Sequence, residues 1–464
     1  MEEFEDKRQE EFLEEEEGED FIEQIKTFID NGNDEELLSY LSSTHPADTA
    51  ETMTALDDDD AALYLLRLCS YEDQAHVLIE LNEDLLSSIL ENLNLKELAE
   101  IFQFLESDDI IYLVSQLPSE KGEQALNTIS TREAFRLRKQ LKYEEYTAGR
   151  LMSNEFATAR ETDTVRKGIL SLRRVAKNDH DIFLLFVTDQ EGVVRGYVGL
   201  KDLFFSNPRA KIQEIMKTSI KTVHYSMKQE EVARFFQKYD YVSAAVVDDE
   251  ERMIGRITVD DVLDVMQQEA SEDIYKMAGL SEDERIYAPV WDTVKTRIPW
   301  LHLNLLTAVL ASSVVTFFES TIGRVVALAS LMPIVAGMGG NAGTQSITVV
   351  VRSIATGELG DRNWKQAIFR ELLIGLFNGI ILGFVTAFFV YFFKHNLALA
   401  IVIGLAMLIN LLIAGLVGSS IPIILKYFDI DPAIASSIFV TTFTDIFGFF
   451  CFLGLASLFI TYLV

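Results

Sequence analysis

Asp445 is the residue of this sequence whose setting most strongly suggests chemistry. It lies in the apolar run SSIFVTTFTDIFGFFCFLG, about twelve residues into the last predicted span, and at about 1.5 Å of helix rise per residue this places it near the middle of a bilayer. A carboxylate at that depth is costly unless it faces water, a cation or a partner. Every Lys and Arg of the C-terminal region lies at the end of an apolar run. An internal ion pair is therefore disfavoured, and a pore carboxylate or a protonated packing residue remains.

A second polar feature is the segment GMGGNAGTQS, residues 337–346, which lies inside another apolar run. Pro333 is expected to loosen the helix before it, and four glycines could then expose backbone carbonyls. Irregular backbone at membrane depth persists only where it lines a cavity or is buried in protein. The segment is therefore predicted to line a pore, and a close-packed interface of small residues is the alternative.

The oxygen atoms of these two regions suit a hard cation. Mg²⁺ binds through one or two carboxylates and keeps several of its waters, whereas soft metals need clusters of Cys, Met or His. For the threonines before Asp445, a hydrogen bond to a carbonyl of their own helix is an equally good interpretation. The predicted pore ligands are Asp445, Asn341, Thr344, Gln345 and Thr441.

The elements that must position these residues are apolar runs of about 20 residues or more, the length that crosses a bilayer. Five spans are predicted, at residues 299–318, 326–351, 368–393, 397–425 and 433–463. With the N-terminus inside the cell, seven Lys or Arg flank the inner ends and two lie in the outer loops. This bias predicts a multi-pass protein of the cell membrane with a cytoplasmic N-terminal part and an external C-terminus.

The charge of the chain lies outside the membrane part. The sequence has 40 Lys or Arg and 72 Asp or Glu, but only seven of each follow Leu301, so the first 300 residues carry the whole net charge of −32. Such an acidic surface argues against nucleic acid as a partner and favours solubility or divalent cations. The two cysteines have no spacing that indicates a disulfide or thiolate metal site.

The acidic part divides by pattern into several regions. Residues 1–20 have no apolar core and predict a disordered acidic tail rather than a signal peptide, with a frayed first helix as the alternative. Residues 21–145 have leucines at helical spacing and predict an all-α superhelical domain. Residues 271–298 predict a connecting helix that ends at the membrane surface, and an inert spacer is the alternative.

Between these helical regions lies an α/β repeat. FVTDQEGVVRGYVGLKDL (186–203) aligns with VVDDEERMIGRITVDDV (246–262). This repeat resembles a tandem CBS pair, with domains at 146–208 and 209–270. The resemblance implies an adenosine-nucleotide pocket, which Gly255, Thr258 and Asp261 match in the second copy. In the first copy Gly196 and Asp202 match, but Gly199 replaces the hydroxyl residue. ATP binding and a purely structural scaffold remain equally good interpretations.

Taken together, the motifs resemble one family of transporters. GMGGNAGTQS, Asp431-Pro432, Asp445, the CBS repeats, YEEYTAGRLM (143–152) and HPAD (45–48) resemble the MgtE family of magnesium channels, from about residue 21 to the end. The resemblance implies a homodimer with a pore between the membrane domains, in which Asp445 of each chain holds hydrated Mg²⁺. It also implies that cytosolic Mg²⁺ bridges acidic residues and closes the pore.

Candidate regulatory ligands for that second role are carboxylates of the helical, CBS and connecting regions. A solvated surface is the alternative for any one of them, and helix capping is the alternative for the last. They are Asp108, Asp109, Glu230, Glu231, Asp240, Asp260, Asp261, Asp264, Glu269, Glu272, Asp273 and Asp431.

The function predicted from these features is Mg²⁺ import, and the chain is predicted not to be an enzyme because it lacks a nucleophile–base pair or a metal-ligand cluster. Alternatives are a CBS-regulated channel for another divalent cation or for an anion, and a nucleotide sensor that transports nothing. An anion channel would need basic groups or helix N-termini at its filter, and no Lys or Arg lies in the middle of a span.

Overall fold

The computed structural model describes residues 21–176, 182–281, 290–360, 362–428, 430–434 and 437–463. The predicted acidic tail, residues 1–20, lies outside the described residues. The chain forms two compact units, Met1–Val265 and Met266–Val464, which are described separately.

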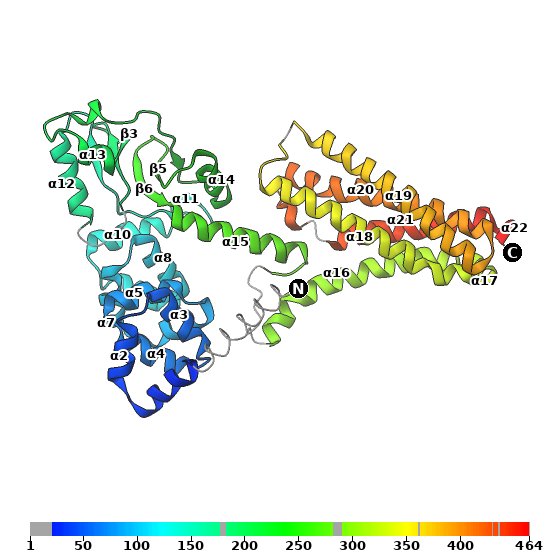
Figure 1. Cartoon of the computed structure of the whole chain (residues 1–464), viewed down its shortest axis with the longest axis horizontal. Coiled ribbons are helices and arrows are strands. Elements are labelled where there is room, and N and C mark those ends of the chain that lie inside the picture. The colour runs from blue at the N-terminus through cyan, green and yellow to red at the C-terminus, as the bar shows by residue number, and fades with distance from the viewer. Residues whose placement is uncertain are drawn as a thin grey trace, which may run out of the picture. The chain divides into compact units, whose positions relative to one another are not determined.

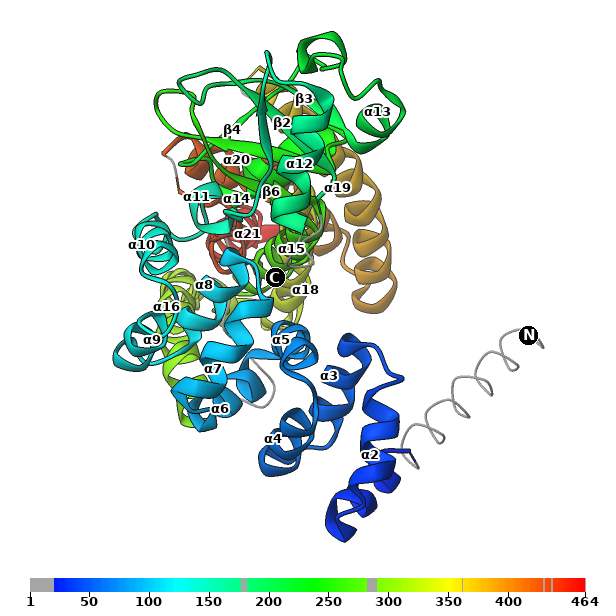
Figure 2. The same cartoon turned by 90° about the vertical axis from the view of Figure 1, so that its left-hand side faces the viewer.

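The first unit begins with a stack of short helices (Figures 1 and 2). Asp58, Ser70 and Asn82 each precede a helix and accept hydrogen bonds from backbone N–H groups of its first turn, which are otherwise unsatisfied. Helices two apart along the chain contact each other repeatedly, as in a superhelix. The predicted all-α superhelical domain is confirmed. Its elements are α2 (Asp34–Leu41), α3 (Pro46–Ala55), α4 (Asp59–Leu68), α5 (Tyr71–Glu80), α6 (Glu83–Asn92), α7 (Leu95–Ile101), α8 (Ser107–Gln116), α9 (Ser119–Leu126) and α10 (Thr131–Gln140).

Two small sheets of identical topology follow, as the repeat predicts. Each has a first strand parallel to the second and a third antiparallel to it. Val187 pairs with Gly196 in one sheet and Val246 with Gly255 in the other, and the same register shift follows in both. The elements are α11 (Ala148–Leu151), β1 (Thr158–Arg160), α12 (Val165–Val175), β2 (Leu184–Thr188), β3 (Val194–Gly199), α13 (Leu200–Phe205), β4 (Val223–His224), α14 (Gln229–Tyr239), β5 (Ser243–Val247), β6 (Met253–Thr258) and α15 (Val259–Met277).

The predicted connecting helix over residues 271–298 is not one element. Residues 271–277 are the last turns of α15, which ends where Gly279 adopts a φ of +73°. The Leu280 N–H donates to the Tyr275 carbonyl at 2.9 Å, and this arrangement closes a helix with glycine in the left-handed region. Helix α16 (Val290–Phe317) contains the rest of the predicted segment, apart from residues 282–289, which lie outside the described residues.

The second unit consists of long helices around α20 (Leu397–Tyr427), which contacts three others (Figure 1). Among the described residues, α16, α19, α20 and α21 have the length and hydropathy to cross a membrane. The span predicted at 326–351 corresponds to α18, 29 residues long, whose crossing stays a prediction. The other elements are α17 (Glu319–Arg324), α18 (Ala327–Ala355), α19 (Trp364–Lys394), α21 (Ser437–Leu458) and α22 (Ile460–Leu463).

The expectation of irregular backbone in residues 337–346 is wrong. Helix α18 runs without a break through Pro333 and the four glycines. Gly339, Gly340 and Gly343 are buried against neighbouring helices, and tertiary packing of this kind outweighs the low helix propensity of glycine. The carbonyls of this segment therefore remain in a helical backbone rather than forming an open loop.

Candidate functional site

Glycines bring α18 into close contact with α21. A Cβ added at Gly340 would lie 3.2 Å from Cγ2 of Thr441, and one at Gly343 would lie 2.1 Å from Cγ1 of Val440. At Gly339 it would lie 3.1 Å from Cβ of Thr444. Small residues that let two helix backbones approach are typical of membrane interfaces. The small-residue interpretation is therefore correct for these three glycines, whereas Gly337 has nothing within 4 Å of such a Cβ.

The polar residues of α18 lie mainly on its exposed face. Asn341, Thr344 and Thr348 are exposed and recur at helical spacing, whereas Gly343 and Ile347 between them are buried. We call Asn341, Thr344 and Thr348 the polar stripe. Gln345 is also exposed and borders a cavity beside α19. The packing of the chain on itself therefore leaves the predicted side-chain oxygens of α18 uncovered.

Asp445 has no cationic partner within the described part of the chain. No described Lys, Arg or His nitrogen lies within 4.0 Å of its carboxylate, and its side chain is partly exposed. The threonines before it donate to carbonyls of their own helix: Thr441 to Ser437 at 2.8 Å and Thr442 to Ile438 at 2.6 Å. The predicted back-bonding is confirmed, so these hydroxyls can offer only oxygen lone pairs to a ligand.

Asn410 is a buried polar residue that sequence reasoning missed. It is fully buried, its Nδ2 donates to the Val335 carbonyl at 2.8 Å, and its Oδ1 has no hydrogen-bond partner among the described residues. Gly339 and Gly448 make room for its amide. It thus links α20 to α18 where α21 also packs. A single amide in the run IGLAMLINLLIAG was the signal that could have indicated it.

Glu371 is a second buried residue whose role the sequence did not indicate. In the sequence it is one acidic residue near the start of the third predicted span. Its side chain is 5% exposed, and Oε2 accepts a hydrogen bond from Ser346 Oγ at 2.8 Å. Arg370 Nη1 lies 3.5 Å from Oε1, but the Arg370 side chain is 68% exposed. The carboxylate borders a cavity of about 190 Å³ that Gln345 and Asn378 also line.

In the first unit, several predicted carboxylates crowd together where α8 meets the second sheet. Burial, followed by repulsion from Asp261, raises the pKa of Asp108 well above its usual value. Burial, Asp261 and Glu106 raise the pKa of Asp109 to about 7, and burial raises that of Asp261 to about 6. Within the part of the chain that the structure describes, Asp108 Oδ1 is buried without a hydrogen-bond partner. We call Glu106, Asp108, Asp109, Asp260 and Asp261 the acidic cluster.

Arg256 supplies a buried positive charge next to the acidic cluster. The Arg256 side chain, 2% exposed, places Nη2 2.6 Å from Oε1 of Glu106. Ser153 also donates to Glu106, and Ser107 donates to Glu155 at 2.9 Å. These bonds tie the helical domain to the CBS region, whereas the aspartates beside them remain crowded.

The predicted nucleotide residues lie among the same elements. Asp261 Oδ2 accepts hydrogen bonds from the N–H and hydroxyl of Thr258, at 3.1 and 2.5 Å. A Cβ at Gly255 would lie 2.5 Å from the sulfur of Met152, so Gly255 allows the segment before the sheets to pack on β6. Asp202 lies 3.6 Å from Lys217 Nζ in the first copy.

The remaining predicted regulatory carboxylates are distributed over several elements. Glu230, Glu231, Asp240 and Asp264 are exposed on α14 and α15. Glu269 and Asp273 lie further along α15, and Lys276 pairs with Glu272 on that helix and with Asp431 at 2.9 Å. The other Asp431 oxygen accepts from the Ala433 N–H at 2.8 Å, so the capping alternative is confirmed. In the described ranges no three His, Cys, Asp or Glu form a ready metal site.

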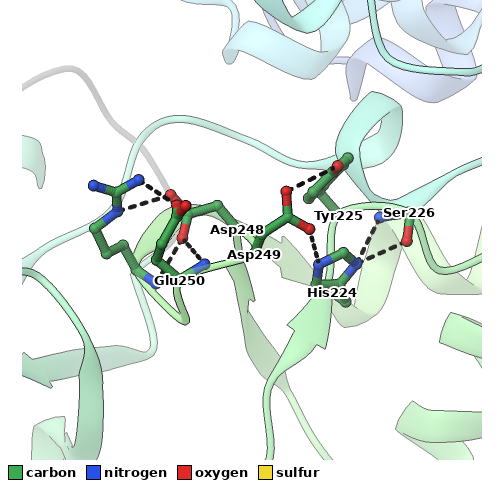
Figure 3. Close-up of polar contacts among 7 residues, drawn as sticks. His224, Tyr225, Ser226, Asp248, Asp249 and Glu250 are labelled. Atoms are coloured by element: carbon green, nitrogen blue, oxygen red, sulfur yellow. Dashed lines mark hydrogen bonds and ion pairs between the residues drawn. The ribbon is translucent and has the colours of Figure 1, made fainter.

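The turn between β5 and β6 shows how the more exposed acidic residues are used (Figure 3). Asp249 accepts from Tyr225 and lies 3.2 Å from His224 Nε2, while Asp248 pairs with Arg252 at 2.9 Å. Both carboxylates have local partners, but the Asp249 side chain is 71% exposed whereas that of Asp248 is 21% exposed. The interpretation as a solvated surface therefore fits Asp249.

Comparison with known proteins places all parts of the chain in one family. The MgtE family of divalent cation transporters matches residues 332–455, the MgtE intracellular N domain matches residues 44–146, and a CBS domain matches residues 212–268. The magnesium transporter MgtE of Thermus thermophilus is 34% identical over 79% of each chain. That of Bacillus subtilis is 29% identical over 95% of this chain and 98% of its own.

A solved structure resembles the first unit. The cytosolic domain of the Mg²⁺ channel MgtE in complex with ATP has 30% sequence identity and a TM-score of 0.50, and the match covers 53% of this chain and 99% of that one. The family profiles, the extent of the similarity to the relatives and the shared architecture agree. The chain belongs to the MgtE family of magnesium transporters.

Proposed function

We propose that this protein is a Mg²⁺-selective channel that imports magnesium across the cell membrane. The observation that carries the proposal is Asp445, a carboxylate within an apolar helix that has no cationic partner among the described residues. A hydrated Mg²⁺ ion would supply the missing charge and bind through one or two carboxylates while keeping its waters. The names of the relatives, magnesium transporters, point to the same cargo.

The polar stripe supports a pore between two copies of the chain. Asn341, Thr344 and Thr348 are exposed on a helix that otherwise packs through apolar and small residues. Amide and hydroxyl groups are unfavourable against lipid. A homodimer that places this stripe and Asp445 around an aqueous path would remove that cost, with Thr441 and Gln345 contributing further oxygens.

The acidic cluster supports regulation by cytosolic Mg²⁺. Asp261 repels Asp108 and Asp109, and one carboxylate oxygen of Asp108 has no hydrogen-bond partner among the residues that the structure describes. A divalent cation bound there would offset the repulsion and hold the helical domain against the second CBS domain. We propose that loss of this cation at low cytosolic Mg²⁺ loosens the contact and opens the pore, and that the carboxylates of α15 contribute as well.

ATP binding at the CBS pair is proposed on the solved relative, whose structure is a complex with ATP. Thr258 and Asp261 are the candidate contacts, with Gly255 and Asp202. Because Asp261 also belongs to the acidic cluster, we expect ATP to bind more tightly when Mg²⁺ neutralises that carboxylate. Calorimetric titration of the full-length protein with ATP, with and without Mg²⁺, measures this.

The central test is flux in liposomes with internal and external Mg²⁺ varied independently. The wild-type protein is expected to carry Mg²⁺, and Asp445→Ala is expected to lower the flux at least tenfold. Glu319→Gln serves as the matched control, because it removes an exposed carboxylate of the same unit outside the long helices. Undiminished flux in Asp445→Ala would refute the pore assignment.

The same assay separates the alternative functions. Flux of another divalent cation in place of Mg²⁺ would indicate a different cargo, and chloride flux would indicate an anion channel. ATP binding without any ion flux would indicate a nucleotide sensor. Reduced flux when Mg²⁺ is raised on the cytosolic side alone is expected if the acidic cluster regulates the pore.

A further inference from the structure

We infer that Glu371 is a positioning residue that fixes the rotation of α18 through its hydrogen bond to Ser346. The inference rests on the proposed transport function, because it concerns how the polar stripe is oriented toward the ion path. Glu371 lies on α19 and Ser346 on α18. Both side chains are buried, at 5% and 6% exposure.

The backbone of α20 brings these two residues together. A Cβ at Gly415 would lie 2.6 Å from the Glu371 carbonyl oxygen, and one at Gly418 would lie 2.7 Å from the Gly343 carbonyl oxygen. The latter would also lie 2.9 Å from Cβ of Ser346. Helices α18 and α19 therefore both pack closely on neighbouring positions of α20, which leaves the Glu371 carboxylate facing the Ser346 hydroxyl.

Ser346 differs from the other hydroxyl residues of these helices. Thr348 donates to the Thr344 carbonyl at 2.9 Å and Ser419 to the Gly415 carbonyl at 2.7 Å, each within its own helix. This is the usual behaviour of Ser and Thr in spanning helices. Ser346 instead donates to a carboxylate of another helix at 2.8 Å. A hydrogen bond between two buried side chains of different helices can hold one helix in a fixed orientation against the other, which a bond within one helix cannot do.

The position of Ser346 on α18 makes it suitable for setting the orientation of the polar stripe. At 3.6 residues per turn, residues two apart lie about 200° apart around a helix. Ser346 is two residues after Thr344, so its side chain lies on the opposite side of α18 from the stripe. The cavity of about 190 Å³ beside Glu371 leaves space for α18 to turn once the bond is lost.

The first test measures the orientation of α18 directly. In a full-length background with Cys69→Ser and Cys451→Ser, Thr344→Cys is labelled with a membrane-impermeant methanethiosulfonate reagent. Adding Ser346→Ala or Glu371→Ala is expected to slow that labelling at least threefold and to increase labelling of Ile347→Cys, a position that is 2% exposed in the native structure. Unchanged labelling at both positions would overturn the inference.

The second test uses Mg²⁺ flux through the cysteine-containing protein in liposomes. Ser346→Ala and Glu371→Ala are each expected to lower flux about threefold to tenfold, and the double variant is expected to lower it no further, because the two residues act through one bond. Glu371→Gln retains an acceptor oxygen and is expected to keep at least half of the flux. Additive losses, or Glu371→Gln as impaired as Glu371→Ala, would contradict the proposed role.

Controls separate this inference from folding and from the proposed function. Ser330→Ala removes a hydroxyl of α18 that donates only to its own helix, at 2.8 Å to the Ala327 carbonyl, and is expected to leave both readouts unchanged. Size-exclusion chromatography identifies variants that fail to fold, which the conservative Glu371→Gln is expected to avoid. If the wild-type protein carries no Mg²⁺, the proposed function fails, while the labelling test still decides the role of Glu371.

Discussion

The two units of this protein handle buried carboxylates in opposite ways. In the first unit burial, followed by the charge of Asp261, raises the pKa values of Asp108 and Asp109. In the second unit Glu371 and Asp445 lie on separate helices, and Glu371 has a hydroxyl donor of its own. Carboxylates that lie close together repel one another, and a bound cation can offset that repulsion and strengthen the contact between the elements that carry them. A carboxylate without such neighbours does not depend on a cation in this way. This difference fits the roles proposed above, in which Mg²⁺ bound at the acidic cluster regulates the pore and Asp445 contributes to Mg²⁺ conduction.

The largest expected effect comes from removing the positive charge beside the acidic cluster. Arg256→Met is expected to destabilise the contact between α8 and β6 by about 3–5 kcal/mol, because a buried pair loses one partner. Hydrogen–deuterium exchange of the full-length protein measures this in peptides covering α8 and β6. Glu106→Gln is the matched variant and is expected to lose less protection, since it also removes one of the crowded carboxylates. Equal loss in the two variants would argue against crowding.

Packing in the second unit gives the next largest effect. Gly418→Ala is expected to destabilise the helix bundle by about 1–3 kcal/mol, as overpacking does, because its Cβ would lie 2.7 Å from a backbone carbonyl oxygen. Gly337→Ala is the control, since nothing lies within 4 Å of its Cβ. Thermal unfolding in detergent compares the two. A larger loss of stability in Gly337→Ala would show that the exposed face of α18, rather than its packed face, limits stability.

Neutralising the acidic cluster is expected to stabilise the first unit without Mg²⁺. Asp108→Asn removes a carboxyl group whose charged form is disfavoured by burial and by repulsion from Asp261, and the neutral amide is expected to avoid a cost of about 1–3 kcal/mol. Exchange protection of α8 is expected to rise in Mg²⁺-free buffer and to respond less to added Mg²⁺. Glu230→Gln, on an exposed face of α14, is expected to change neither quantity.

The last expected effect is a pH dependence of the first unit. The pKa of Asp109 rises from 3.8 to about 7 in the folded protein, so the folded state binds more protons than the unfolded state across that range. Stability of the α8 contact therefore falls as the pH rises from about 4 to about 7 and is constant above that window. Exchange measured in Mg²⁺-free buffer at several pH values, corrected for the intrinsic rate, tests this, and Asp109→Asn is expected to reduce the slope.

Much of the fold followed from local patterns. Leucine spacing predicted the helices of residues 21–145, and the aligned halves predicted two sheets with matching registers. The sequence also indicated that Asp108, Asp109 and Asp261 could lie close together, because all three were candidate ligands of the same regulatory cation. These features depend on neighbours in sequence or on a repeat, both of which a single sequence displays.

Features that depend on partners distant in sequence were missed or predicted wrongly. The helix is continuous through Gly339 and Gly343 because these glycines pack against α20 and α21. Helix propensity is a property of each residue alone and does not include such tertiary contacts. In the sequence, Asn410 is an isolated amide and Glu371 is a charge at the end of a span. Their roles depend on contacts with α18, which is distant from both in sequence. The break at Gly279 was missed because the acidic and basic residues around it continue a helical pattern.

The polar stripe has a consequence for how the protein enters the membrane. Helix α18 is absent from the group of described helices whose hydropathy suffices for a span, whereas α20 reaches a mean hydropathy of 2.8. Insertion as a single segment depends on such hydropathy. We therefore expect α18 to be retained in the bilayer only once its neighbouring helices are present. The polar stripe, which is proposed to line the ion path, would then also make α18 the last helix to insert stably during biogenesis.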